Sequence, residues 1–314
     1  MRISLPEAVL LLESGKVIAV PTETVYGLAA RLDRPEAITN IFSLKGRPSN
    51  NPLIIHVASP EEIPHYVDSI PDDFYKLSKT FWPGPLTLIL PAKTHTIPDI
   101  ARAGLPTAAF RVPDHLLTRE LLSKTGPLVM PSANLSGSPS ATSREHVETD
   151  FGIDFPVLDG GACHKGLEST ILYLNQEKIW IVARLGALVP EDFAPILGYI
   201  PEVMKKGGET PICPGQLYRH YAPKSRLFLM TTIPADSEGA IIGYSDRQYP
   251  QGCRLFSLGN SLNPAEAAQR LYAVLRQLDI ERVESAIVDM NIPNDGLWLT
   301  LKERLLKAAE KKIL

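Results

Sequence analysis

Residues 35–57 read PEAITNIFSLKGRPSNNPLIIHV and have the pattern of a helix, a turn and a strand. Apolar residues recur at helical spacing as far as Lys45, and Gly46 is the residue type that ends helices. Arg47 begins a turn that Pro48 makes rigid, and the apolar run after it predicts a buried strand. The segment therefore predicts an α/β fold, in which helices pack on a sheet.

The same alternation continues on both sides of this segment. Ser4 and Glu7 predict a capping box that opens an amphipathic helix before Gly15. Strands are expected at residues 15–24, 51–57, 85–92, 107–113, 126–132, 155–159, 168–174 and 178–184. Helices are expected at residues 35–46, 71–82, 115–126 and 143–152. Many strands with interleaved helices predict a sizeable mixed sheet with helices packed on it.

Composition changes at Pro190. Six prolines and the sequence KKGGE between residues 190 and 223 are typical of a partly stiff linker. After it the alternation resumes, with strands, a helix that Asn263 caps, and a final helix. In the capped helix, the apolar spacing predicts a buried stripe of Ala268, Leu271, Tyr272 and Leu275. We therefore expect a first domain at 1–189, a linker at 190–223 and a small α/β domain at 224–314.

Bulk composition excludes several classes of protein. The 314 residues are 44% hydrophobic and 21% charged, which is typical of a globular chain. No apolar run is long enough to span a membrane, and Glu7 interrupts the N-terminal stretch that resembles a signal peptide. The three cysteines lie far apart with no C-x-x-C pair, so we expect neither a zinc site nor a disulfide framework, and a cytoplasmic location.

The net charge of −3 is divided unevenly along the chain. Residues 1–194 hold 17 Lys and Arg against 22 Asp and Glu, whereas residues 195–314 hold 15 against 13. Neither part has the basic excess that tight nucleic-acid binding requires. Any anion-binding site must therefore be local.

Common nucleotide-binding and metal-binding motifs are absent from the sequence. The glycines of GACHKG at residues 161–166 have P-loop spacing, but Leu167 and Glu168 follow where Lys and Ser or Thr should stand. Cys163 and His164 are adjacent, yet adjacency in sequence is not the geometry of a catalytic pair. The chain has no convincing nucleophile motif.

Polar residues near predicted strand ends are the remaining candidates. Lys45 and Arg47 are either solvated turn residues, with Lys45 complementing the helix dipole, or a site for polyphosphate. Arg111 lies in the apolar run TAAFRVP and must be paired if it is buried, and a substrate carboxylate would serve. Ser132 and Asn134 follow an apolar strand, in a loop that is either an ordinary turn or an oxygen-binding nest.

A second candidate stretch is VIAVPTETVYGL. Thr22 and Thr24 are expected to project to one face of a strand and Glu23 to the other. Gly27 allows a neighbouring backbone to approach closely. For the threonines, plain β-propensity is the simpler explanation, and His56 in its apolar strand is by default a core histidine.

Seven segments in order closely resemble the L-threonylcarbamoyladenylate synthase family, in its longer, two-domain, YrdC-like form. They are PTETVYGL, KGRPSNNPLIIHV, FWPGPLTLIL, FRVP, PSANLSG, GLESTI and PGQLYRHYAP, and the resemblance covers residues 3 to about 225. It implies a twisted mixed sheet with flanking helices and a concave active site, followed by a small Rossmann-like α/β domain. Cys213 departs from the family, which usually has serine there, and this puts one linker contact in doubt.

The resemblance also implies an activity. It implies a nucleotidyltransferase that condenses L-threonine, bicarbonate or CO2, and ATP with Mg²⁺ into L-threonylcarbamoyl-AMP and pyrophosphate. The product would pass to a tRNA threonylcarbamoyl-transferase that forms N6-threonylcarbamoyladenosine on tRNA. Little stable binding of tRNA and no membrane contact are implied for the chain itself.

Individual site residues are carried over from the family motifs. The K-x-R and S-x-N elements make Lys45, Arg47, Ser132 and Asn134 the catalytic cradle, with no metal ligand from the protein. Threonine is expected to contact Thr24, His56, Arg111 and Ser169, with its carboxylate on Arg111. The ATP site is expected to include Arg47, Asn51, Thr107, Ser132, Ser140 and Arg184, with Tyr221 folding over its mouth from the linker. Thr170 and Ser143 stay as alternatives to Ser169 and Ser140.

Two other classes of protein stay open. An RNA-binding module could use the same concave surface, although the acidic balance of the first domain argues against it. A carbamoyl-transfer maturation factor could share the domain, but it would also carry an acylphosphatase-like segment and C-x-x-C zinc fingers, and this chain has neither. The sequence indicates neither the oligomeric state nor the role of the last ninety or so residues.

Overall fold

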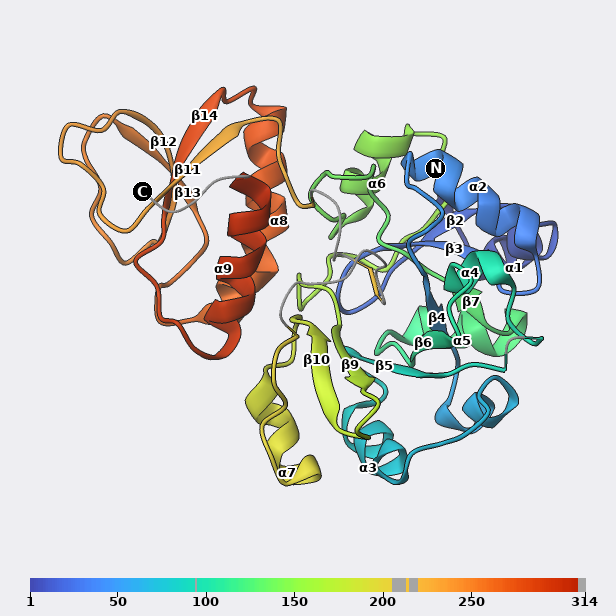
Figure 1. Ribbon diagram of the computed structural model, residues 1–314. Coiled ribbons are helices and arrows are strands. Elements are labelled where there is room, and N and C mark those ends of the chain that lie inside the picture. The colour runs from blue at the N-terminus through green and yellow to red at the C-terminus, as the bar shows by residue number, and fades with distance from the viewer. Residues whose placement is uncertain (94, 205–212, 215–219, 310–314) are drawn as a thin grey trace.

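The computed structural model describes residues 1–93, 95–204, 213–214 and 220–309. Two sheets organise these residues (Figure 1). The larger has the strand order β1-β8-β2-β3-β7-β4-β6-β5-β9-β10. Its strands are β1 (Arg2–Ile3), β2 (Ile18–Val20), β3 (Gly27–Arg31), β4 (Ile54–His56), β5 (Leu86–Pro91), β6 (Thr107–Arg111), β7 (Leu128–Val129), β8 (Val157–Leu158), β9 (Thr170–Leu174) and β10 (Trp180–Arg184). Its pairs are both parallel and antiparallel, so the expected mixed sheet is confirmed.

Helices pack on both faces of this sheet. They are α1 (Leu5–Glu13), α2 (Pro35–Lys45), α3 (Asp72–Phe81), α4 (Asp99–Arg102), α5 (Leu116–Thr125) and α6 (Arg144–Phe151), with a 3-10 turn at η1 (Pro60–His65). Alternate residues of a strand point to opposite faces. Ile18 and Val20 of β2 accordingly pack in one core with α1 and α5, whereas Ala19 between them packs in the core that includes α2 and α3.

Local signals in the sequence give the expected helix ends. The Ser4 backbone N–H donates to Glu7 Oε2 at 2.7 Å, which is half of the predicted capping box. Gly46 ends α2 in the left-handed conformation, with φ 60°. The Glu266 N–H donates to Asn263 Oδ1 at 3.2 Å, which caps α8 (Pro264–Ile280) as expected.

The strand expected at residues 15–24 ends earlier, at Val20, because Pro21 cannot donate to a ladder. The chain turns and returns as β3, which pairs antiparallel with β2 and was not expected from its small residues. A Cβ atom on Gly27 would lie 2.9 Å from Met130 Cβ, so the expected close approach at Gly27 is confirmed. The early strand end leaves residues 21–26 in a loop, and this loop carries Glu23 and Thr24.

The second sheet is smaller and parallel, in the order β11-β14-β12-β13. It consists of β11 (Arg226–Met230), β12 (Gly239–Gly243), β13 (Cys253–Ser257) and β14 (Ser285–Asp289). Two helices, α8 and α9 (Gly296–Ala309), lie between this sheet and the larger body in Figure 1. The buried stripe expected on α8 is confirmed, and it comprises Ala268, Leu271, Tyr272 and Leu275.

Between the two sheets the chain is partly helical. The 3-10 turn η2 (Pro190–Phe193) leads into α7 (Ala194–Leu197). The Phe193 ring lies edge-on to the ring of Phe81 in α3, with ring centroids 5.1 Å apart. Residues 205–212 and 215–219 of the predicted linker lie outside the described residues. In the described ranges, no helix is long and apolar enough to cross a membrane.

Candidate functional site

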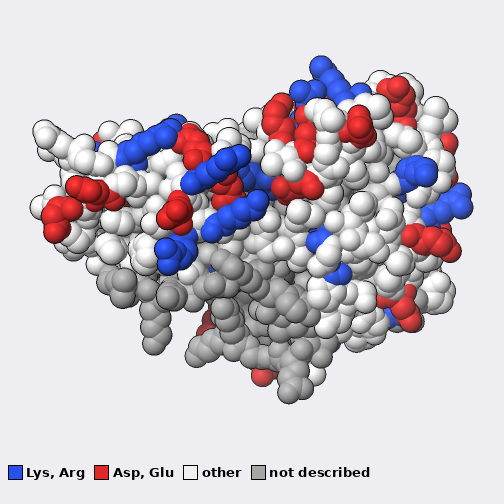
Figure 2. All heavy atoms as spheres, turned by 90° about the horizontal axis from the view of Figure 1, so that it is seen from above, with Lys and Arg blue, Asp and Glu red and all other residues white. Residues whose placement is uncertain are grey.

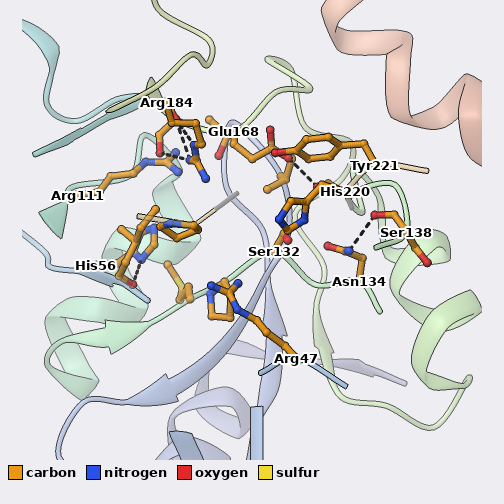
Figure 3. A pocket seen from close by; sticks show the side chains of 18 residues that line it. Arg47, His56, Arg111, Ser132, Asn134, Ser138, Glu168, Arg184, His220 and Tyr221 are labelled. Carbon is orange, nitrogen blue, oxygen red and sulfur yellow. Dashed lines mark hydrogen bonds between the residues drawn. The ribbon is translucent and has the colours of Figure 1, made fainter. Parts of the chain in front are cut away.

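One pocket gathers most of the residues that the sequence singled out (Figure 3). Thirteen positions were expected in the site, and ten of them line this pocket: Thr24, Arg47, His56, Arg111, Ser132, Asn134, Ser140, Ser169, Arg184 and Tyr221. They come from strand ends and loops that are far apart in the chain. The pocket lies where the loop after β2, the turn after α2, and the ends of β4, β6 and β10 converge.

Strand register places His56 beside Arg111. The two residues are partners in the parallel pair of β4 and β6, and both are buried. Arg111 Nη2 lies 2.6 Å from Glu23 Oε1, and the two form an ion pair without the alignment of a hydrogen bond. Arg111 Nε donates to the Gly84 carbonyl at 3.2 Å. The expected need for a partner is thus met by Glu23, which the sequence had not indicated. Burial, and then the charge of Arg111, hold the pKa of His56 well below its usual value, so the imidazole is neutral.

Arg184 and Ser169 also line the pocket, and Figure 3 shows the Arg184 side chain beside that of Arg111. Arg184 Nη2 donates to the Ser169 carbonyl at 2.8 Å and to its Oγ at 3.2 Å. The Ser169 hydroxyl is also 2.7 Å from Thr87 Oγ1. Thr170, the alternative to Ser169, donates to the Leu188 carbonyl instead and does not line the pocket.

The turn after α2 carries Arg47 into the pocket. Its Nη2 donates to the carbonyls of Pro52 at 3.1 Å and Asn51 at 3.3 Å, so the turn is closed on itself. Lys45 does not line the pocket. Its Nζ is buried and donates to the carbonyls of Asn134, at 2.7 Å, and Ser132. Lys45 therefore fixes the S-x-N loop against the end of α2.

Burial is the main cause of the lowered pKa of Lys45, followed by the charge of Arg47.

The S-x-N loop that Lys45 holds is further stabilised by hydrogen bonds within the loop. Asn134 Nδ2 donates to the carbonyls of Leu135 at 2.7 Å and Ser138 at 3.0 Å. The direct contact of Lys45 with ATP stays a prediction.

Other expected residues are also placed. Asn51 is buried and its carbonyl accepts a hydrogen bond from Arg47. Thr107 begins β6, four residues or roughly 13 Å of strand from Arg111. Neither lines this pocket. Ser143, the alternative to Ser140, occupies the N-cap position of α6, whereas Ser140 reaches the pocket.

Glu168 was missed by the sequence analysis, although it lies within GLESTI. Its side chain is buried, lines the pocket, and accepts a hydrogen bond from Ser140 Oγ at 2.7 Å. Tyr272 of α8 and Arg304 of α9 contact the same carboxylate. Burial raises the pKa of Glu168, but Arg304, Arg184 and Ser140 outweigh it and hold that pKa below its usual value. In the sequence, the signal that could have indicated Glu168 is an acidic residue at the start of an apolar strand, because acidic residues are rarely buried without a partner.

His220 and Tyr221 close one side of the pocket (Figure 3). Burial, and then the charges of Arg47 and Lys307, lower the pKa of His220 to about 3, so it is neutral at physiological pH. Tyr221 stacks on Tyr272 with ring centroids 5.4 Å apart. Tyr218 and Arg219, which precede them, lie outside the described residues.

The arrangement favours binding and charge stabilisation over covalent catalysis. Three arginines and several neutral hydroxyl and amide groups surround the pocket. Cys163 is buried away from it, and burial raises the pKa of its thiol to about 12, which leaves it unreactive. Within the described ranges, no group of three or more His, Cys, Asp or Glu could hold a metal ion. These residues do not fit a protein-held metal site.

Comparison with known proteins shows the family of this chain. A family model described as "Telomere recombination" matches residues 10–186, and one described as "Threonylcarbamoyl-AMP synthase, C-terminal domain" matches residues 186–310. Threonylcarbamoyl-AMP synthases of Bacillus subtilis and Pyrococcus abyssi are each 36% identical to this chain. The two alignments cover 98% and 96% of this chain, respectively, and 93% of each relative. The crystal structure of P. abyssi Sua5 complexed with L-threonine has a TM-score of 0.90 at 32% identity and covers 100% of this chain and 98% of that one. The chain belongs to the threonylcarbamoyl-AMP synthase family.

Proposed function

We propose that this protein condenses L-threonine, bicarbonate or CO2, and ATP into L-threonylcarbamoyl-AMP and pyrophosphate. The observation that carries the proposal is the convergence of ten expected residues on one pocket. Full-length similarity to threonylcarbamoyl-AMP synthases supports it. The alternative of a carbamoyl-transfer maturation factor is not favoured by these relatives.

The threonine end of the pocket is formed by Arg111 and His56. Arg111 offers a guanidinium to the substrate carboxylate, and Glu23 is its ion-pair partner in the protein. Neutral His56 adds a polar contact without a second positive charge. Thr24 and Ser169 complete this end with hydroxyl groups.

The ATP end is formed by Arg47, Arg184 and the S-x-N loop. An oxygen of threonine carbamate forms a bond to the α-phosphorus, and the bond from that phosphorus to pyrophosphate breaks. Negative charge accumulates on pyrophosphate as it leaves, and fixed cations stabilise that charge. Mg²⁺ would enter on the phosphates of ATP, which is how Mg²⁺ is commonly held.

The steps around this reaction are also proposals. Bicarbonate or CO2 supplies the carbamate carbon, and the adenylate passes to a tRNA threonylcarbamoyl-transferase. A cytoplasmic location rests on the three free cysteines. The division at residues 189 and 223 into two domains and a linker stays a prediction.

The charge on the face shown in Figure 2 does not favour an RNA-binding role. On the face in Figure 2, Lys and Arg side chains lie among Asp and Glu side chains. RNA-binding surfaces usually concentrate one sign of charge.

A coupled pyrophosphate assay tests the proposed function. We expect pyrophosphate release to require ATP, threonine and bicarbonate together, and to fall to background when any one is omitted. Release that is independent of threonine would contradict the proposal.

A further inference from the structure

Side chains from α8 and α9 reach the wall of the pocket. Tyr272 and Arg276 project from α8, and Arg304 projects from α9. All three are buried, and Arg304 is 0% exposed. Burying two guanidinium groups is costly unless each is paired, so their partners are informative.

Glu168 is the first partner. Its Oε1 accepts from Ser140 Oγ at 2.7 Å and from the Tyr272 hydroxyl at 2.9 Å. Its Oε2 is 2.9 Å from the same hydroxyl and accepts from Arg304 Nε at 3.1 Å. The Tyr272 hydroxyl has one proton, so both of its short distances describe one donor, and three donors in all hold this carboxylate. Glu168 is therefore fixed in place by three donors where it lines the pocket.

The backbone beside Ser140 is the second partner. Arg276 Nη2 donates to the Pro139 carbonyl at 2.6 Å, and its Nε donates to the Ser140 carbonyl at 3.3 Å. The same guanidinium forms a two-pronged ion pair with Asp150 of α6, at 2.7 and 2.9 Å. Ser140 is thus held at its carbonyl by Arg276 and at its hydroxyl by Glu168.

Tyr221 is the third partner. Its ring stacks on Tyr272 at an interplanar angle of 23°, and the Arg304 guanidinium lies 4.8 Å from the centre of its ring. Tyr272 and Arg304 thus contact both Glu168 and an aromatic side chain of the pocket. The contacts connect the second α/β unit to the site through two helices.

We propose that Tyr272, Arg276 and Arg304 are positioning residues, through which the C-terminal unit holds Ser140, Glu168 and Tyr221 in the geometry that binds ATP. The proposal rests on the proposed function for the placement of ATP beside Ser140. It assigns the last ninety or so residues a role in the active site. They shape one wall without touching the reacting atoms.

Tyr272→Phe is the most selective test. It removes the hydroxyl that contacts Glu168 but keeps the ring that stacks on Tyr221. We expect the dissociation constant for ATP, measured by titration calorimetry, to rise about tenfold, the lower end of the value of one hydrogen bond to a charged group, because this bond acts on ATP only through Ser140. Threonine affinity should change much less, since Arg111 and His56, which are expected to hold threonine, make no hydrogen bond to Tyr272 or to Ser140.

Tyr249→Phe is the matched control. It makes the same chemical change in the same unit, where the Tyr249 hydroxyl donates to Asp289 at 2.8 Å, and neither residue lines the pocket. This variant should bind ATP like the wild type. If Tyr272→Phe lowers the melting temperature strongly, Arg304→Lys replaces it, because lysine keeps the charge but cannot reproduce the guanidinium contacts.

A double-mutant cycle tests the route through Glu168. If Tyr272 acts on ATP by fixing Ser140, then Tyr272→Phe and Ser140→Ala should be less than additive in their effects on ATP affinity. Full additivity, or wild-type ATP affinity in folded Tyr272→Phe, would overturn the proposal. This test measures ATP binding, whereas the proposed function is tested by product formation. A wild-type protein that binds ATP but makes no adenylate would therefore refute the proposed function and leave this test valid.

Discussion

Replacing Arg111 with lysine separates a substrate-binding role from a structural one. Lysine keeps a positive charge near Glu23, so the buried carboxylate is not left uncompensated. It loses the Nε contact with the Gly84 carbonyl and the fork that holds a carboxylate through two parallel hydrogen bonds. The change therefore removes the geometry for the threonine carboxylate and keeps most of the local charge.

The expected loss follows from the contact removed. A hydrogen bond to a charged group is worth about 1.5–3 kcal/mol, which corresponds to a rise of about 10- to 150-fold in the dissociation constant for threonine. The dissociation constant for ATP should change far less, because the expected ATP contacts are other residues. Calorimetric titration with each substrate separately measures both values.

A matched variant controls for the arginine-to-lysine change itself. Arg31→Lys alters a residue paired with Asp33 outside this pocket, and it should leave both affinities unchanged. Equal losses of threonine and ATP affinity in Arg111→Lys would refute the reasoning. They would indicate that Arg111 supports the pocket as a whole.

Three further predictions concern charge and protonation. Arg47→Ala should lower pyrophosphate release by about 100-fold or more with a nearly normal melting curve, and unchanged turnover would remove Arg47 from the site. Burial lowers the pKa of His146 to about 4, so the unfolded chain binds more protons than the folded chain between about pH 6.5 and 4. The free energy of unfolding, measured with urea, should therefore fall as the pH is lowered through that window. His146→Gln should reduce the slope of this free energy against pH, and an unchanged slope would contradict the prediction. Cys163→Ala should keep wild-type turnover, because its thiol is neutral, and a folded but inactive variant would contradict the absence of a cysteine nucleophile.

Much of the fold follows from local patterns. Helix α8 was expected with its cap at Asn263 and its buried stripe, because capping and apolar spacing are encoded within one helix. Strand β3 was not expected, because Gly27, Leu28 and two alanines have weak strand propensity and are in a strand only through their pairing with β2 and β7. Pairing of this kind is a tertiary effect.

The site residues also fall into those that local sequence patterns or family motifs indicated and those that depend on distant contacts. Arg111 was indicated because an arginine in an apolar strand demands a partner, and family motifs indicated Ser132 and Asn134. Glu23 and Glu168 were missed, because each finds its partners far away in the sequence. Tyr272 was assigned to the apolar stripe of α8, and it is buried there, but its hydroxyl contacts Glu168 at a separation of 104 residues. No pattern within one element predicts such a contact.

The identity of the product tests the central claim most directly. The protein is incubated with ATP, L-threonine and ¹³C-bicarbonate, and the adenylates are analysed by mass spectrometry as pyrophosphate is released. We predict an AMP-linked product that carries threonine and one heavy carbon, formed in step with pyrophosphate. ADP and phosphate, or a threonine adenylate without the heavy carbon, would contradict the claim.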